Sequence, residues 1–257
     1  MEIKVYNMDS RSFITISIDD GAPQDLKAAE LLDRFGLKGT FYIPATNSEH
    51  PSLSLDGIRA ISKKFEVGGH TFHHQPLTGL SPQKIKSEIQ DGKTWLEDVT
   101  GTSVKSFCYP QGKFNPRIVQ MVKNAGFQGA RTCLFNLNNF PQNPYLWGVS
   151  THAYSHSPLI QLRHALLEKN FLGLWNYAKI FRFQKKWADH FATAITHVEK
   201  YGGVAHLYFH SWEIHDQGDW KTLEDLLCFA SKHKKLIPIT NGDLFTLWWI
   251  KVQSKDG

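Results

Sequence analysis

Residues 13–21 read Phe-Ile-Thr-Ile-Ser-Ile-Asp-Asp-Gly (FITISIDDG), and this stretch decides the fold. Apolar residues alternate with Thr15 and Ser17, a pattern that predicts a half-buried β-strand. The strand ends in two adjacent carboxylates, Asp19 and Asp20. Taken alone, Asp-Asp-Gly reads as a turn with a helix cap. If other polar side chains lie close to the two carboxylates, the same Asp-Asp-Gly sequence indicates a functional site.

Further strands alternate with helices along most of the chain. Apolar, β-branched or aromatic runs predict strands at 39–43, 65–69, 106–109, 127–131, 204–210 and 236–239. Helical periodicity and capping residues predict helices at 23–35, 54–64, 81–101, 115–126 and 220–233, and a last one after Thr240. About seven β/α units fit, which favours an α/β fold in the form of a parallel barrel. We expect a single domain over residues 1–257, with a helical insertion at about 157–200.

Composition narrows the class of protein. The chain has 257 residues, of which 41% are apolar, and no run of 18 apolar residues that would predict a membrane span. The N-terminal sequence MEIKVYNMDSRS has no basic segment followed by an apolar one, so we expect a cytoplasmic protein. Three cysteines without a C-x-x-C motif predict no structural disulfide.

The net charge of +5 is uneven. Residues 157–200 hold seven Lys or Arg and three Asp or Glu. No nucleic-acid-binding motif accompanies them, so we expect no nucleic-acid partner. Phe171, Leu174, Trp175, Ala178 and Phe181 fall at helical spacing among the basic residues, which indicates a peripheral membrane contact through about 171–187. A helix packed on the barrel with its charges in water is the alternative interpretation.

Polar residues follow several of the predicted strands. Asp19 and Asp20, His70 and His74, Tyr109-Pro110-Gln111, Arg131 and His210 each stand at or just beyond a strand end. In parallel barrels the carboxyl ends of the strands meet at one face, where the chemistry is found. We therefore expect these residues to converge.

Three His-x-x-x-His pairs were compared as metal ligands. His206 and His210 share one strand, which separates them by ~13 Å, too far for one ion. His152 and His156 have no evident carboxylate partner and are expected to be surface or cleft residues. His70 and His74 follow a strand end, and with one carboxylate they would form an Asp/His/His site. A pairing of His70 with His73 stays open on spacing alone. If Asp20 binds the ion, Asp19 is free to take a proton from water.

These residues together resemble the polysaccharide deacetylase family, carbohydrate esterase family four. The motifs appear in the family's order as SIDDG, HTFHH, CYPQG, RTC…LWG and LYFHSWE. The resemblance covers about residues 13–247, apart from the insertion, and implies a distorted barrel of about seven β/α units. It further implies that Asp20, His70 and His74 bind a divalent metal, usually Zn²⁺.

The resemblance also implies the other site roles. Asp19 is the general base, His210 is the general acid, and the amide near Gln111, after Tyr109 and Pro110, holds the oxyanion. Cys108 stands where many members carry an arginine that orients the base, and we expect Arg131 to replace it. Trp147 and Trp212 are candidates for an aromatic wall of the substrate site.

The resemblance implies removal of N-acetyl groups from amino sugars. Since no export signal is seen, we expect a nucleotide-linked or lipid-linked precursor of a surface polysaccharide or O-antigen as substrate. Hydrolysis of another amide, as by deformylases or ureide and purine-ring hydrolases, remains open, and so does a non-catalytic carbohydrate-binding role.

Overall fold

The computed structural model describes residues 11–253. Most of the N-terminal sequence discussed above and both ends of the predicted domain therefore lie outside the described residues. The strands are β1 (Ser12–Asp19), β2 (Thr40–Ile43), β3 (Glu66–Gly69), β4 (Ser106–Cys108), β5 (Gly129–Arg131), β6 (Thr151–His152), β7 (Gly203–His210) and β8 (Leu236–Pro238). The helices are α1 (Asp25–Arg34), α2 (Leu55–Ser62), α3 (Pro82–Thr100), α4 (Pro116–Asn124), α5 (Pro158–Leu167), α6 (Phe171–Lys179), α7 (Trp187–Tyr201), α8 (Ser211–Asp216), α9 (Trp220–Lys232) and α10 (Asn241–Gln253).

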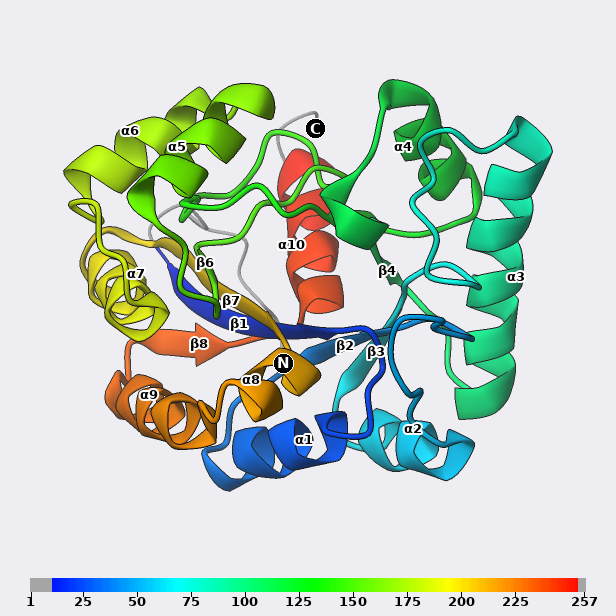
Figure 1. Cartoon of the computed structure of the whole chain (residues 1–257), viewed down its shortest axis with the longest axis horizontal. Helices are drawn as coiled ribbons and strands as arrows, with labels where there is room; N and C mark the ends of the chain where they lie inside the picture. Colours follow the sequence, from blue (N-terminus) through cyan, green and yellow to red (C-terminus); the bar gives the residue numbers. More distant parts are fainter. Residues whose placement is uncertain (1–10, 254–257) are drawn as a thin grey trace.

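One parallel sheet organises the chain. Its strand order is β5-β4-β3-β2-β1-β7-β6, with β8 added against the start of β1. Within the described residues β5 and β6 do not pair with each other, so the sheet curls into an open, distorted barrel (Figure 1). The segment before β6 nearly bridges the gap, because Trp147 exchanges backbone hydrogen bonds with β5 and Ser150 donates one to β7. The predicted α/β barrel is confirmed.

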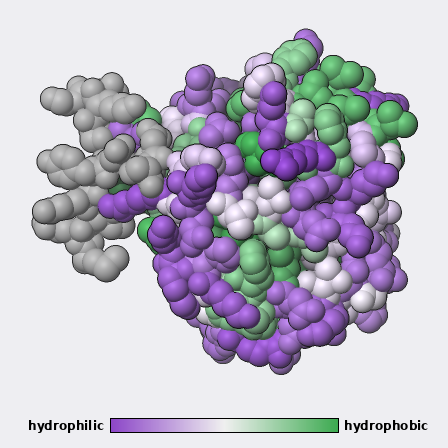
Figure 2. Space-filling model, turned by 90° about the vertical axis from the view of Figure 1, so that its left-hand side faces the viewer, coloured by the Kyte–Doolittle hydropathy of each residue, from purple (hydrophilic) through white to green (hydrophobic). Residues whose placement is uncertain are grey.

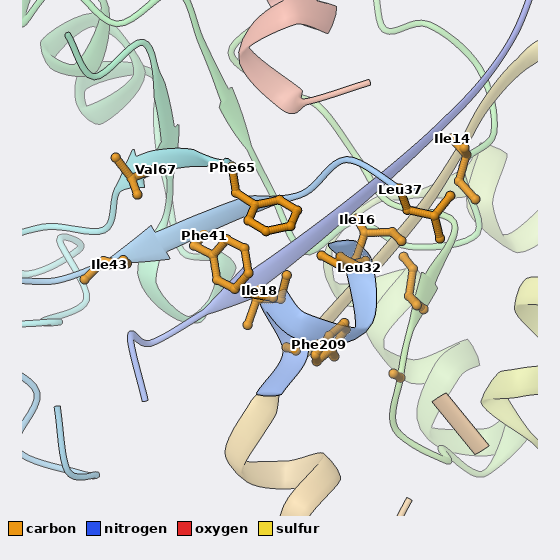
Figure 3. Close-up of a cluster of buried hydrophobic side chains, with 14 of the residues drawn as sticks. Ile14, Ile16, Ile18, Leu32, Leu37, Phe41, Ile43, Phe65, Val67 and Phe209 are labelled. Carbon is orange, nitrogen blue, oxygen red and sulfur yellow. The ribbon is translucent and has the colours of Figure 1, made fainter. Parts of the chain in front are cut away.

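Strand β1 is buried on both faces, whereas its alternating pattern predicted a half-buried strand. Ile14, Ile16 and Ile18 pack with Phe41 and other apolar side chains beneath the surrounding helices (Figure 3). The other face turns into the barrel, where Thr15, Ser17 and Asp19 bond to Asn241, His206 and Arg131. The alternation therefore separates an apolar outer face from a polar barrel interior, and the residues of both faces are buried.

Helix α10 closes the amino-terminal end of the barrel. Its Leu244 and Phe245 pack against Phe13 and Val204, which lie near the starts of β1 and β7. At its first turn, Asn241 bonds to Thr15, Thr40 and Tyr42 inside the barrel. With that end filled, only the carboxyl-terminal end of the sheet is free to form a site.

The predicted insertion at 157–200 is shorter than expected. Helix α7 packs on β1, β7 and α9, burying Trp187, Phe191 and Ile195, and so serves as the crossover helix between β6 and β7. Only α5 and α6 stand outside the β/α repeat. The sequence missed this because β6 has two residues, too few to show a strand pattern. Short α8 was also missed, since it follows β7 without a turn signal.

No helix among residues 11–253 has the length and apolar character needed to cross a bilayer. All three cysteines are free.

Candidate metal and catalytic site

The sheet register brings the predicted residues to one edge. Asp19 of β1 lies opposite His210 of β7, and Cys108 of β4 lies opposite Arg131 of β5. Gly68 of β3 precedes His70 and allows close packing, because a Cβ there would stand 2.5 Å from the Tyr42 ring. A pocket of about 340 Å³ opens at this edge and is lined by Asp19, Asp20, His70, His74, Gln111, His210 and Trp212, among others.

Backbone conformation at the pocket is unusual. Asp20, Thr71, His74 and Gln111 all have φ between +55° and +80°, a region that side-chain-bearing residues rarely occupy. Such conformations cost free energy and persist where the surrounding structure enforces them, often at functional sites. Here they aim Asp20 and His74 at each other, and they turn the peptide at Gln111 within the pocket lining.

Asp20, His70 and His74 form a compact donor set. One oxygen and two ring nitrogens from these residues lie within 4.8 Å of one another, and all three residues are buried. Asp20 Oδ1 is 3.0 Å from His74 Nε2 and 3.6 Å from His70 Nε2, yet it makes no aligned hydrogen bond. A buried carboxylate oxygen without a hydrogen bond, facing two imidazole nitrogens, fits a divalent cation.

Neighbouring groups orient these three donors. His70 Nδ1 is 2.9 Å from the carbonyl oxygen of Cys108, which fixes the tautomer and leaves Nε2 for the site. Trp212 Nε1 donates to Asp20 Oδ2 at 3.0 Å, so Oδ1 remains for the cation. Glu49 Oε2 stands 3.7 Å from His74 Nδ1. His73 instead bonds to Glu88, away from the donor set.

Asp19 and Arg131 form a buried ion pair beside the donor set. Arg131 NH2 donates to Asp19 Oδ2, and the guanidinium lies between the rings of Tyr42 and Tyr208. Burial opposes the charge on Asp19, but Arg131 and the nearby His70 and His210 hold the pKa of its carboxyl below the ordinary value. Cys108 Sγ lies 3.6 Å from the same carboxylate oxygen. Arg131 thus contacts the carboxylate from the strand beside Cys108.

His210 is held by Glu213, which sequence reasoning did not single out. His210 Nδ1 is 2.7 Å from Glu213 Oε2, and His152 Nε2 is 3.2 Å from the same oxygen. Burial opposes the charge on His210, yet Glu213, Asp20 and Asp19 raise the pKa of its imidazole to about 9. Burial lowers the pKa of His152 to about 4. The spacing of His210 and Glu213 at the start of a helix was the signal that could have revealed this pair.

The β7–α8 corner that carries His210 and Glu213 is fixed from below. Ser211, between them in the sequence, donates a hydrogen bond to the buried carboxyl of Asp25 at the start of α1. Burial raises the pKa of Asp25 well above its ordinary value, and the carboxylates of Asp20 and Asp19 add to this. The corner is therefore anchored to the body of the barrel rather than to a loop.

Three predicted substrate contacts, Tyr109, Pro110 and Trp147, are corrected, because none of them lines the pocket. Trp147 packs in the core with Phe13 and Phe245 and is 2% exposed, because its segment seals the gap beside β5. The Tyr109 side chain is fully buried, and its hydroxyl donates to the carbonyl of Tyr145. Pro110 is buried too, and only Gln111 of that loop lines the pocket. Trp212 does line it, stacked on His50 at 3.8 Å.

The far wall of the pocket comes from residues that the sequence pattern did not indicate. Cys133 and Phe135 follow β5. His152 is the last residue of β6, and His156 follows this strand. His164 belongs to α5, and Glu168 caps the end of that helix. His152 Nδ1 is 3.1 Å from His156 Nε2. These two histidines are cleft residues, and Glu213 is the carboxylate partner that the sequence did not reveal.

The chain is similar in sequence to known polysaccharide deacetylases. Residues 7–130 match the sequence profile of the polysaccharide deacetylase family. The Bacillus subtilis protein YxkH, whose name assigns it to the polysaccharide deacetylases, is 25% identical over 122 residues, covering 46% of this chain and 44% of that protein. A peptidoglycan-N-acetylglucosamine deacetylase of Bacillus cereus is 24% identical over 157 residues, covering 58% and 70%. The chain thus spans less than half of the first relative's length.

Solved structures share the fold. A family 4 acetyl xylan esterase from Clostridium thermocellum, in complex with a cobalt ion, has a TM-score of 0.56 at 18% identity over 91% of both chains. A pseudoenzyme of the same family from Bacillus anthracis has a TM-score of 0.54 at 14% identity, over 92% of this chain and 66% of that one. The profile match over residues 7–130, just under half of the chain, together with the barrel and the order of the motifs, makes the chain similar to the polysaccharide deacetylase family.

Proposed function

We propose that this protein is a divalent-metal-dependent hydrolase that removes N-acetyl groups from an amino sugar of a polysaccharide or its precursor. The observation that carries the proposal is the convergence of Asp19, Asp20, His70, His74 and His210 in one pocket. Similarity to the family alone is insufficient, because a pseudoenzyme shares the fold. The proposal therefore rests on the side chains that the pocket holds.

The residues divide the chemistry as follows. Asp20, His70 and His74 would hold the cation, with Zn²⁺ proposed for a site of two imidazoles and one carboxylate. A divalent cation supplies Lewis acidity, which favours deprotonation of water and polarises a carbonyl. Asp19 takes the proton from the attacking water, and Arg131 holds its carboxylate in place.

His210 supplies the proton that the departing amine needs. Because Glu213 binds its Nδ1, the Nε2 atom is the one turned to the donor set, 3.9 Å from Asp20 Oδ2. The backbone amide at Gln111 is the proposed donor to the oxyanion, set by the left-handed turn of that residue. Trp212 is the proposed aromatic wall for the sugar ring.

For the substrate, we propose a nucleotide-linked or lipid-linked precursor of a surface polysaccharide such as O-antigen, handled in the cytoplasm. The support is that the pocket of about 340 Å³ extends beyond Asp20, His70 and His74. The far wall, with His156, His164 and Glu168, offers hydrogen-bonding groups to a second sugar or to a phosphate.

The test is product identification. Metal-loaded protein is incubated with free, nucleotide-linked and lipid-linked N-acetyl and N-formyl sugars, and acetate and formate are quantified. We expect acetate, absent after chelation and from the Asp19→Asn variant. Formate alone would identify a deformylase instead. If neither acetate nor formate is released while the metal site is fully loaded, the proposed hydrolysis is contradicted for both substrate classes. That result would favour a binding role.

A further inference from the structure

Helices α5 and α6 expose an unusual amount of apolar surface. Fourteen large apolar side chains of residues 11–253 are exposed, and eight of them fall within positions 159–183. They are Leu159, Ile160, Leu166, Leu167, Phe171, Leu172, Trp175 and Phe183, exposed by 44–78%. We call these eight residues the apolar face. Figure 2 shows hydrophobic side chains gathered at the upper end of the molecule, where α5 and α6 lie in Figure 1.

The two helices bury polar side chains beside the small Ala165 and the ring of Tyr177. Gln161 of α5 and Asn176 of α6 are buried, and Asn176 Nδ2 donates to the carbonyl of Asn136 at 2.8 Å. Asn170, the cap of α6, is buried as well and donates to the carbonyl of Phe135 at 2.9 Å. A helix on a soluble protein normally buries its apolar stripe and exposes its polar one. Here hydrogen bonds and the buried Tyr177 attach the helices to the barrel, and the apolar face points outward.

This arrangement differs from the predicted membrane contact at 171–187. Helix α6 ends at Lys179, and Phe181 is buried against His190 with ring centroids 3.7 Å apart. Phe171 and Trp175 are exposed as expected. The exposed surface extends instead onto α5, which sequence periodicity did not indicate because α5 has polar residues on its inner side.

Basic residues surround the apolar face. Positions 158–186 carry six Lys or Arg and a single acidic residue, Glu168. Arg163 lies between Leu159 and Leu166 on α5, and the Lys179 Nζ stands 5.1 Å from the centre of the Trp175 ring. Arg182, Lys185 and Lys186 follow and are exposed. Long cationic side chains beside exposed Leu, Phe and Trp suit an interface of acyl chains below anionic headgroups.

We infer that the α5–α6 surface docks on an anionic membrane, with the apolar face entering the headgroup boundary and the basic residues contacting lipid phosphates. The surface adjoins the candidate active site, because His164 of α5 and Glu168 at its end line the pocket. Docking therefore brings the pocket close to the bilayer. The further conclusion that the substrate is lipid-linked rests on the proposed function, whereas the docking itself does not.

Vesicle flotation tests the docking. The protein is mixed with vesicles of phosphatidylcholine alone and with vesicles in which a third of the lipid is phosphatidylglycerol. We expect binding to the anionic vesicles, weakened by high salt and reduced about tenfold or more in the Phe171→Ser/Trp175→Ser variant. The matched control is Leu26→Ser/Leu55→Ser, which removes two exposed apolar side chains from α1 and α2 and should bind like the parent.

Several results would overturn the inference. One is absence of binding to anionic vesicles, and another is equal loss in both double variants. A dimer in light scattering that the Phe171→Ser/Trp175→Ser variant dissociates would assign the surface to a second copy instead. Acetate release from a soluble sugar is measured in parallel. It should be unchanged in both double variants, so a failure of the proposed function is recognised separately from a failure of docking.

Discussion

The Asp19–Arg131 pair allows the most quantitative test of the site. Both side chains are almost completely buried, and Arg131 donates a hydrogen bond directly to the carboxylate. Replacing Arg131 by Met keeps much of the side-chain volume and removes the charge. Because a buried carboxylate is left without its partner, the free energy of unfolding should fall by about 3–5 kcal/mol.

A double-mutant cycle separates loss of the pair from loss of packing. In an Asp19→Asn background the carboxylate that pairs with Arg131 is absent, so Arg131→Met should cost about 2–3 kcal/mol less than it does in the parent. Urea unfolding of chelator-treated protein measures all four free energies without a contribution from bound metal. Equal costs in the two backgrounds would refute the pairing as the source of the effect.

The same variant tests whether Arg131 acts on the base. Metal-loaded Arg131→Met should retain one cation per chain and lose turnover, while Arg131→Lys should recover part of it, since a lysine supplies charge without the planar fork. Turnover equal to the parent in Arg131→Met would show that the arginine does not position Asp19. Loss of the cation would instead place Arg131 in support of the metal site.

Three further predictions concern other parts of the site and the core. Trp212→Phe removes the hydrogen bond to Asp20 Oδ2 and should weaken metal affinity about 10–100-fold by calorimetry; unchanged affinity would contradict a role in orienting Asp20. Glu213→Gln should lower turnover about tenfold or more while metal content stays constant, because His210 loses its anionic partner; an unaffected rate would exclude that partnership. Burial lowers the pKa of His190 and of His206 to about 3, so unfolding takes up protons below their ordinary pKa. The contribution of these two neutral histidines to the free energy of unfolding should be fully present above pH ~6.5. It should fall by about 1.4 kcal/mol per pH unit for each histidine as the pH drops towards ~3. In urea titrations His190→Gln should have the shallower pH slope, and a slope equal to the parent would contradict a neutral buried His190.

The sequence predicted the barrel well because β1 and its neighbours have strong patterns. The structure retains local signals that predicted the ends of helices, such as the Ser81 cap and the left-handed Gly101 that bound α3. Parallel strands have only one carboxyl edge, so the approximate strand ends were enough to bring Asp20, His70 and His74 together.

What the sequence could not give depends on tertiary contacts. The burial of Trp147 follows from its pairing with β5 across the gap in the barrel, which no local pattern encodes. The wall of the pocket that holds His152 and His164 is formed by the two-residue strand β6 and by helix α5, which buries Gln161 and exposes large apolar side chains. Neither segment has the periodicity by which a strand or a helix is predicted. The contact between Glu213 and His210 could be predicted only if a helix were known to begin directly after His210.

The most direct test of the central claim is acetate release during titration of a divalent metal into metal-stripped protein. If Asp20, His70 and His74 hold one catalytic cation, activity should rise from none and saturate at one equivalent per chain. The His74→Ala variant should show no such saturation at one equivalent. Acetate release by the stripped protein at the rate of the loaded one would contradict the account.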